Sequence, residues 1–211
     1  GMTAKVCRAG NCVTVHNGMP ETGMPPACPD RQPPRLIMVA RFEPQKDHAT
    51  LIDALISIRQ QSWSLCLVGD GPLMPQVQQR VESAGLSDRI EFMGARDDVD
   101  ALLSRSQIFV LSTLWESFPR SILEAMRAGL PVVASDIGGC SESARSGWDG
   151  LIVPPGNPHA LAESLSRLID SAELRHKMGL CSREIFERQF TFDHMFARYQ
   201  GLYRETLKSP G

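Results

Sequence analysis

Two basic and two acidic side chains are the strongest candidates for chemistry in this 211-residue chain. Arg41 and Lys46 closely follow one short apolar run. Glu116 and Glu124 follow another apolar run much further along the chain. A guanidinium and an ammonium on one turn are suited to a diphosphate, the first as a planar fork and the second as a point charge. Carboxylates accept hydrogen bonds from sugar hydroxyls, so the four residues predict a site for a sugar diphosphate if the fold brings them together.

A helix expected to begin at Pro119 would add backbone amides to this site, because proline is favoured at the first helical position. Its first free amides would belong to Arg120 and Ser121, and the positive end of the helix dipole favours phosphate. Glu124 would lie about one and a half turns into the helix, where it can accept hydrogen bonds from a ribose. Glu116 would lie nearer the mouth of the crevice, beside a sugar attached to the diphosphate.

Each of these charges also has a simpler interpretation. Arg41 and Lys46 can be solvated surface residues, and Glu124 can pair with Arg120 or Arg127. Taken singly, such roles are more common than ligand contacts. Only the joint presence of these residues at one place favours binding, so the prediction depends on the elements that position them.

Six short apolar segments alternate with segments of helical periodicity from Arg35 onward. Strands are expected at 36–40, 64–68, 89–93, 107–112, 131–135 and 151–153. The alternation predicts a Rossmann-like, doubly wound α/β fold with a six-stranded parallel sheet of order 3-2-1-4-5-6 and extra C-terminal helices. Ligands bind such sheets beyond the carboxyl ends of the strands where the order reverses, which is between the first and fourth strands. The basic pair follows the first strand and the acidic pair follows the fourth, so we expect all four in one crevice.

Capping residues indicate where helices begin. Asn157 followed by Pro158 predicts one helix start, and Asp97 predicts another. Asp98 and Asp100 have the spacing of a metal-binding pair, but their position at this second helix start favours capping.

Two glycine turns leave two interpretations open: Gly69-x-Gly71 and Gly138-Gly139 either admit phosphate or sugar closely or form tight turns. No Gly-Lys-Ser/Thr element is present, which excludes a P-loop. Of the five histidines, only His48 lies near the expected crevice, and we expect it on a helix surface.

Composition excludes several classes of partner. With 22 basic and 24 acidic residues the formal charge is −2, so nothing favours nucleic acid as a partner. No apolar run approaches the roughly 20 residues that span a bilayer, and no signal peptide pattern is found. We expect a cytoplasmic protein.

Residues 1–34 are expected to be an extension or linker, with Gly1-Met2 as a tag remnant. One short strand is expected at 13–16, and six prolines lie between 19 and 34. Cys7, Cys12, His16 and Cys28 have a loose metal-like spacing that fits no zinc pattern, so we predict no metal. A Cys7–Cys12 disulfide would require an oxidising compartment, and reduced thiols are preferred.

The stretch from Glu116 to Glu142 resembles the donor domain of family 4 retaining glycosyltransferases with the GT-B architecture. It contains their Glu-x7-Glu element, the Glu-Ala-Met…Gly-x-Pro-Val-Val-Ala run and the Gly-Gly turn. Upstream, 39–46 is similar to their diphosphate-binding turn, 67–71 to their second-strand loop, and 15–18 to the segment that joins their two domains.

This resemblance implies a nucleotide-diphosphosugar donor, a UDP- or GDP-sugar. Arg41 and Lys46 would hold its diphosphate, Glu124 its ribose, and Glu116 its sugar. The loop of Gly94, Ala95 and Arg96 would lie against the nucleobase. The predicted catalytic residues are Glu116, Arg41 and Lys46, without a metal or cofactor, and the predicted donor-binding set is completed by Phe118, Arg120 and Ser121.

The resemblance also implies that 35–190 is the donor-binding domain and 191–211 a crossover helix and tail. The acceptor, a glycan or a lipid-linked sugar, would be held by a missing N-terminal domain, so this chain alone is expected to be inactive. The aromatic stripe from Phe192 to Tyr203 would either cross to that domain or pack on its own core. Cell-surface polysaccharide or lipopolysaccharide synthesis is the expected setting, with the inner face of the membrane as a place of action.

The sequence departs from the family pattern at a few positions. Ser117 and Pro119 stand where glycines are common, and Gln45-Lys46-Asp47 replaces a frequent Glu-Lys-Gly. These changes bear on sugar specificity rather than on the phosphate site. Two alternatives remain: a nucleotide-sugar epimerase of the same architecture, which the Glu-x7-Glu spacing argues against, and a non-catalytic nucleotide-sugar binding module.

Overall fold

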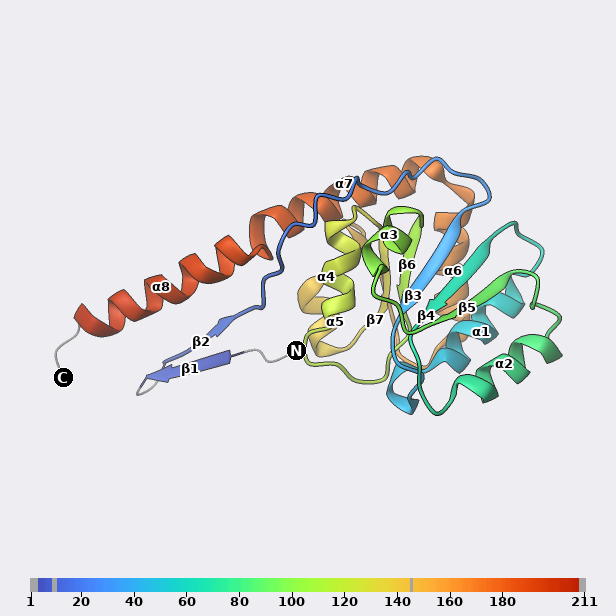
Figure 1. The fold of residues 1–211 in the computed structure, drawn as a ribbon, viewed down its shortest axis with the longest axis horizontal. Coiled ribbons are helices and arrows are strands. Elements are labelled where there is room, and N and C mark those ends of the chain that lie inside the picture. Colours follow the sequence, from blue (N-terminus) through green and yellow to red (C-terminus); the bar gives the residue numbers. More distant parts are fainter. Residues whose placement is uncertain (1–3, 9–10, 145, 209–211) are drawn as a thin grey trace.

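The computed structural model describes residues 4–8, 11–144 and 146–208 (Figure 1). Its main sheet has six parallel strands in the order β5-β4-β3-β6-β7-β8. The strands are β3 (Arg35–Val39), β4 (Ser64–Val68), β5 (Ile90–Gly94), β6 (Ile108–Leu111), β7 (Val132–Ser135) and β8 (Gly150–Val153). Counted from β3, the order is 3-2-1-4-5-6, as the alternation predicts. The strand order reverses between β3 and β6, which are hydrogen-bonded neighbours.

An antiparallel hairpin precedes this sheet, where the sequence predicts only one short strand. It consists of β1 (Ala4–Arg8) and β2 (Asn11–Val15), and Cys7 stands opposite Cys12 in its backbone register. The Cys7 and Cys12 side chains lie outside the described residues, as do Gly1 and Met2, so the structure does not address the predictions made for them.

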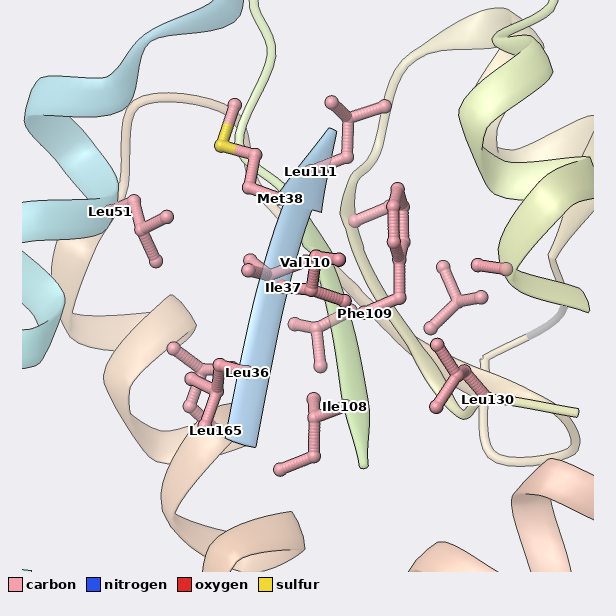
Figure 2. Packing of buried hydrophobic residues seen from close by; sticks show 14 of the residues in the cluster. Leu36, Ile37, Met38, Leu51, Ile108, Phe109, Val110, Leu111, Leu130 and Leu165 are labelled. Atoms are coloured by element: carbon pink, nitrogen blue, oxygen red, sulfur yellow. The ribbon is translucent and has the colours of Figure 1, made fainter. Parts of the chain in front are cut away.

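Helices cover both faces of the sheet. They are the 3₁₀ turn η1 (Pro44–Lys46) and the α-helices α1 (His48–Ser57), α2 (Met74–Ser83), α3 (Val99–Ser104), α4 (Arg120–Arg127), α5 (Gly138–Ser143), α6 (Pro158–Asp170), α7 (Ala172–Gln189) and α8 (Phe192–Lys208). Helix α1 packs on α6, and α4 packs on α7. In Figure 2, Leu51 of α1 and Leu165 of α6 lie on one side of β3, while Leu130 lies toward the other.

The two central strands are apolar because both of their faces are covered. Leu36, Ile37 and Met38 of β3 are fully buried, as are all four residues of β6 (Figure 2). A strand buried on both faces shows a continuous apolar run rather than an alternating one. This core fixes β3 and β6 side by side, so it also fixes the loops that follow them.

Two of the helix starts differ from the sequence prediction. The Asn157 side chain accepts a hydrogen bond from the Ala160 amide at 3.0 Å, which confirms that cap. The predicted Asp97 cap is wrong: α3 follows Asp98, which makes no capping bond and instead accepts hydrogen bonds from Arg96. Helix α4 begins one residue later than expected, because Pro119 occupies the N-cap position.

Helix α8 extends away from the sheet and lies near β2 (Figure 1). Phe192, Phe196 and Tyr203 on α8 are exposed, by 49%, 61% and 68%. The stripe therefore does not pack on the core of the sheet, which removes one of its two interpretations. Within the described part of the chain, no helix combines the length and apolarity needed to cross a bilayer.

Candidate functional site

The loops that follow β3 and β6 are hydrogen-bonded to each other. The Gln45 carbonyl oxygen accepts from the Leu114 amide at 2.8 Å and from the Thr113 hydroxyl at 2.9 Å. The Gln45 side-chain amide donates to the Trp115 carbonyl oxygen at 2.5 Å. Gln45 thus joins the two loops at the point where the strand order reverses, and its chain neighbour Lys46 is placed against the residue after Trp115.

That residue is Glu116, and its carboxylate forms an ion pair with the Lys46 ammonium. The two side chains are only 17% and 11% exposed. The structure thus brings together one predicted phosphate ligand and one predicted sugar ligand. Because little water screens them, the two charges interact more strongly than a surface pair would.

Arg41 does not join this pair. Its side chain is 72% exposed, and its guanidinium bonds the Glu43 carboxylate at 2.7 Å. An exposed ion pair of this kind contributes little to stability, so Arg41 can leave Glu43 for a diphosphate at small cost. The clamp formed by Arg41 and Lys46 stays a prediction.

Glu124 lies half-buried on α4, and burial raises the pKa of its carboxyl group, although nearby Arg120 and Arg127 oppose the shift. Arg127 is committed elsewhere, to the Asp100 carboxylate and to the Pro20 carbonyl oxygen at 2.7 Å. Within the described ranges no group donates a hydrogen bond to the Glu124 carboxylate or forms an ion pair with it. The proposed pairing with Arg127 or Arg120 is therefore not made, and the carboxylate can accept hydroxyl groups.

The glycine turns serve close backbone packing around these loops. A Cβ on Gly139 would collide with the Ser117 carbonyl oxygen, next to Glu116. A Cβ on Gly69 or Gly71 would collide with the backbone of Ala40 or Phe42, which flank Arg41. At both turns the interpretation as a tight packing contact is the one that the structure supports.

The predicted nucleobase loop lies at the same edge of the sheet. Gly94 adopts a left-handed φ of +65°, and its carbonyl oxygen accepts from the Gly69 amide at 2.8 Å. Strand β5 is two positions from β3, or about 10 Å at ordinary strand spacing. Ala95 follows, and Arg96 pairs with Asp98, whose hydrogen bonds lower the pKa of that aspartate. Contact with a base stays a prediction for all three loop residues.

The start of α4 leaves the Arg120 and Ser121 amides available for a ligand, but it does not present the Phe118 side chain to one. Arg120 is exposed and Ser121 half-buried, and no backbone or side-chain acceptor from the described residues is found for either amide. Phe118 is only 1% exposed, so its side chain belongs to the packing beneath the site rather than to a contact surface.

His48 is buried as well, whereas the sequence predicts that it lies on a helix surface. Its ring stacks on Phe42 with centroids 4.2 Å apart. Burial, and secondarily the Lys46 charge, lowers the pKa of His48 to about 4. The ring is therefore neutral at physiological pH and adds no charge beside Lys46.

Two residues near the site carry no sequence signal for it. Cys140 is buried on α5, and burial together with the Glu116 charge raises the pKa of its thiol to about 12. His16 stacks on Phe118 and bonds the Glu142 carboxylate at 3.1 Å. No periodicity or spacing links His16 to residues so far along the chain. Among the described residues, no three His, Cys, Asp or Glu side chains gather as metal ligands would.

Comparison with known proteins finds related sequences and structures. The profile of glycosyl transferases group 1 matches residues 28–184. The N-acetyl-alpha-D-glucosaminyl L-malate synthase of Bacillus anthracis is 30% identical over 174 residues, which are 82% of this chain and 46% of that protein.

Two solved structures superpose closely. Sucrose-phosphate synthase from Thermosynechococcus elongatus gives a TM-score of 0.82 at 26% identity, over 92% of this chain and 52% of that one. Anabaena Alr3699/HepE in complex with UDP gives 0.76 at 26% identity, over 81% and 48%. The chain therefore spans about half the length of these proteins.

Proposed function

Since this chain belongs to the family of glycosyl transferases group 1, we propose that it binds a nucleotide-diphosphosugar as the donor of a sugar. Its fold is that of the C-terminal domain of GT-B enzymes of family 4. The reaction would transfer the sugar, with retention at the anomeric carbon, to a glycan or lipid-linked acceptor held by an N-terminal domain. We expect no transfer from this chain alone.

The observation that carries the proposal is the meeting of Lys46 and Glu116 at the reversal of the strand order. A diphosphate bound there would take the Lys46 ammonium. Glu116, released from its partner, would be free to accept hydrogen bonds from hydroxyls of the donor sugar. One ion pair would in this way be replaced by two ligand contacts.

Negative charge grows on the leaving diphosphate as the sugar departs. Lys46, Arg41 and the free amides at the start of α4 would stabilise that charge, which is electrostatic catalysis by groups already in place. This role needs neither a metal nor a cofactor. Glu124 would hold the ribose with a carboxylate to which none of the described residues donates a hydrogen bond.

The remaining partners follow from the surface and from the relatives. The exposed aromatic residues of α8 give a face on which an N-terminal domain would rest. HepE has been solved with UDP and with UDP-glucose, which favours a uridine donor for this chain. We propose polysaccharide or lipopolysaccharide synthesis in the cytoplasm, at the inner face of the membrane, as its setting.

Calorimetry with UDP and GDP tests the site. We expect the wild-type chain to bind one of them, and Lys46→Ala and Glu124→Ala each to weaken that binding more than tenfold. The exposed α7 residues provide matched controls, Lys177→Ala and Glu173→Ala, which should bind as the wild type does. Wild-type affinity in both site variants would reject the assignment.

A further inference from the structure

A cluster of three aromatic rings lies beneath the candidate site and joins distant parts of the chain. His16 stacks on Phe118, with ring centroids 4.7 Å apart and planes 18° apart. His16 meets Phe190 edge-on at 6.1 Å, and Phe118 lies 5.7 Å from Phe190. We call these three residues the ring cluster. They come from the segment after β2, the loop before α4 and the end of α7.

His16 also reaches α5 on the other side of the same loop. Its Nε2 lies 3.1 Å from the Glu142 carboxylate. Glu142 is on α5, whose Gly139 packs directly against the backbone of Ser117 and Phe118. His16 therefore contacts both the loop that follows Glu116 and the helix that supports this loop.

The position of His16 is itself fixed by backbone contacts. The Met19 amide donates to the Phe190 carbonyl oxygen at 2.8 Å, and the Phe192 amide donates to the Met19 carbonyl oxygen at 3.1 Å. A Cβ on Gly18 would collide with the Thr191 carbonyl oxygen, so the backbones of these two segments are in close contact. The segment carrying His16 is thus held at the junction of α7 and α8.

The ring cluster is close to the site along the chain, because Phe118 lies in the same loop as Glu116. Phe118 follows Glu116 by two positions and precedes the first free amide of α4, that of Arg120, by two. Its ring is 1% exposed and has His16 stacked on it and Phe190 nearby, and the His16 side chain is itself 26% exposed. Without the imidazole, Phe118 would lose this stacked contact and could shift, and Glu116 and the helix start would shift with it.

We propose that His16 is a positioning residue for the donor site. Its ring holds Phe118, and through Phe118 it sets where the Glu116 carboxylate and the Arg120 and Ser121 amides point. The proposal rests on the function proposed above, because it assigns those groups to the donor. The contact also makes the geometry of the site depend on the path of the segment before β3.

The test compares His16→Ala, which removes the ring, with His16→Phe, which keeps a ring for the stack but loses the bond to Glu142. The probe is UDP or GDP, whichever the wild-type chain binds in calorimetry. We expect His16→Ala to weaken binding by up to about tenfold, because the stacking that favours the binding-competent position of Phe118 is worth about 1.4 kcal/mol, and we expect His16→Phe to restore most of the affinity. His159→Ala is the matched control, because that side chain is 84% exposed on α6.

A second readout separates positioning from general loss of stability. In amide NMR spectra, His16→Ala should move the signals of Glu116, Arg120 and Ser121 and leave those of β3 unchanged. If His16→Ala does not fold, His16→Gln replaces it under the same criteria.

Wild-type affinity in His16→Ala, or equal losses in the Ala and Phe variants, would overturn the proposal and leave the proposed function intact. If the wild-type chain binds neither UDP nor GDP, the proposed function fails. The NMR comparison then still decides whether His16 positions the loop, since unmoved signals for Glu116 and Ser121 would refute it.

Discussion

Replacing Glu116 with glutamine should change the affinities for a nucleotide and for its sugar conjugate in opposite directions. Lys46 is paired with Glu116, so a diphosphate must compete with that carboxylate for the ammonium. Glu116→Gln keeps the size of the side chain and removes its charge. Free UDP or GDP should then bind more tightly, because the neutral glutamine competes less strongly with the diphosphate for the Lys46 ammonium. The corresponding nucleotide sugar should lose part of its added affinity, because an amide accepts sugar hydroxyls less strongly than a carboxylate.

The size of the effect follows from the burial of the pair. With side chains 17% and 11% exposed, the charges lie in surroundings of intermediate dielectric. Unit charges about 4 Å apart interact there by about 4 kcal/mol. Much of that is offset by desolvation of the pair, and glutamine still offers Lys46 an oxygen. A net gain of about 1.4 kcal/mol is expected, which corresponds to about tenfold tighter binding of the free nucleotide.

Calorimetry of UDP, GDP and their glucose and mannose conjugates measures both changes. Glu173→Gln on the exposed face of α7 is the matched control, since it removes the same charge away from the site. An affinity for the free nucleotide that is unchanged or weaker in Glu116→Gln would refute the competition between Glu116 and the diphosphate.

Two further predictions concern stability. The pKa of His48 is about 4 in the folded chain against an ordinary 6.5. As the pH falls, the imidazole is therefore protonated in the unfolded chain at a higher pH than in the folded chain. The free energy of unfolding should therefore fall by about 3 kcal/mol as the pH drops from 6.5 to 4, and urea titrations should show a smaller fall in His48→Gln. Gly139→Ala should lower stability by about 1–3 kcal/mol in thermal unfolding, because its Cβ meets the Ser117 backbone. Gly138→Ala is its control, since nothing lies within 4 Å of that Cβ, and equal effects of the two would contradict the packing role of Gly139.

The sheet and the meeting of Lys46 with Glu116 were predictable because both depend on strongly patterned features. Short apolar runs define strands buried on both faces, and a parallel sheet with right-handed crossovers leaves few possible orders. Once β3 and β6 are neighbours, the residues that follow them must lie at one edge. No knowledge of side-chain contacts is needed for that step.

Side-chain directions were not predictable in the same way. Arg41 turns to Glu43, and Asp98 binds Arg96 instead of capping α3. Each of these side chains has several possible partners nearby, and at exposed positions the free energies of the alternative ion pairs differ by little. The burial of His48 depends on a ring in another segment, Phe42, and the contact of His16 with Phe118 depends on how the chain returns across α7. Neither leaves a mark in sequence periodicity.

The double use of the Gln45 carbonyl oxygen has a practical consequence for redesign. The turn with Lys46 and the stretch with Glu116 are joined by this oxygen, by the Gln45 side-chain amide and by the Lys46–Glu116 ion pair, so they behave as a single structural unit. Exchanging either loop alone for that of a relative would remove the hydrogen bonds between the two loops and displace both of them. Attempts to alter sugar preference should therefore transplant 41–47 together with 112–118.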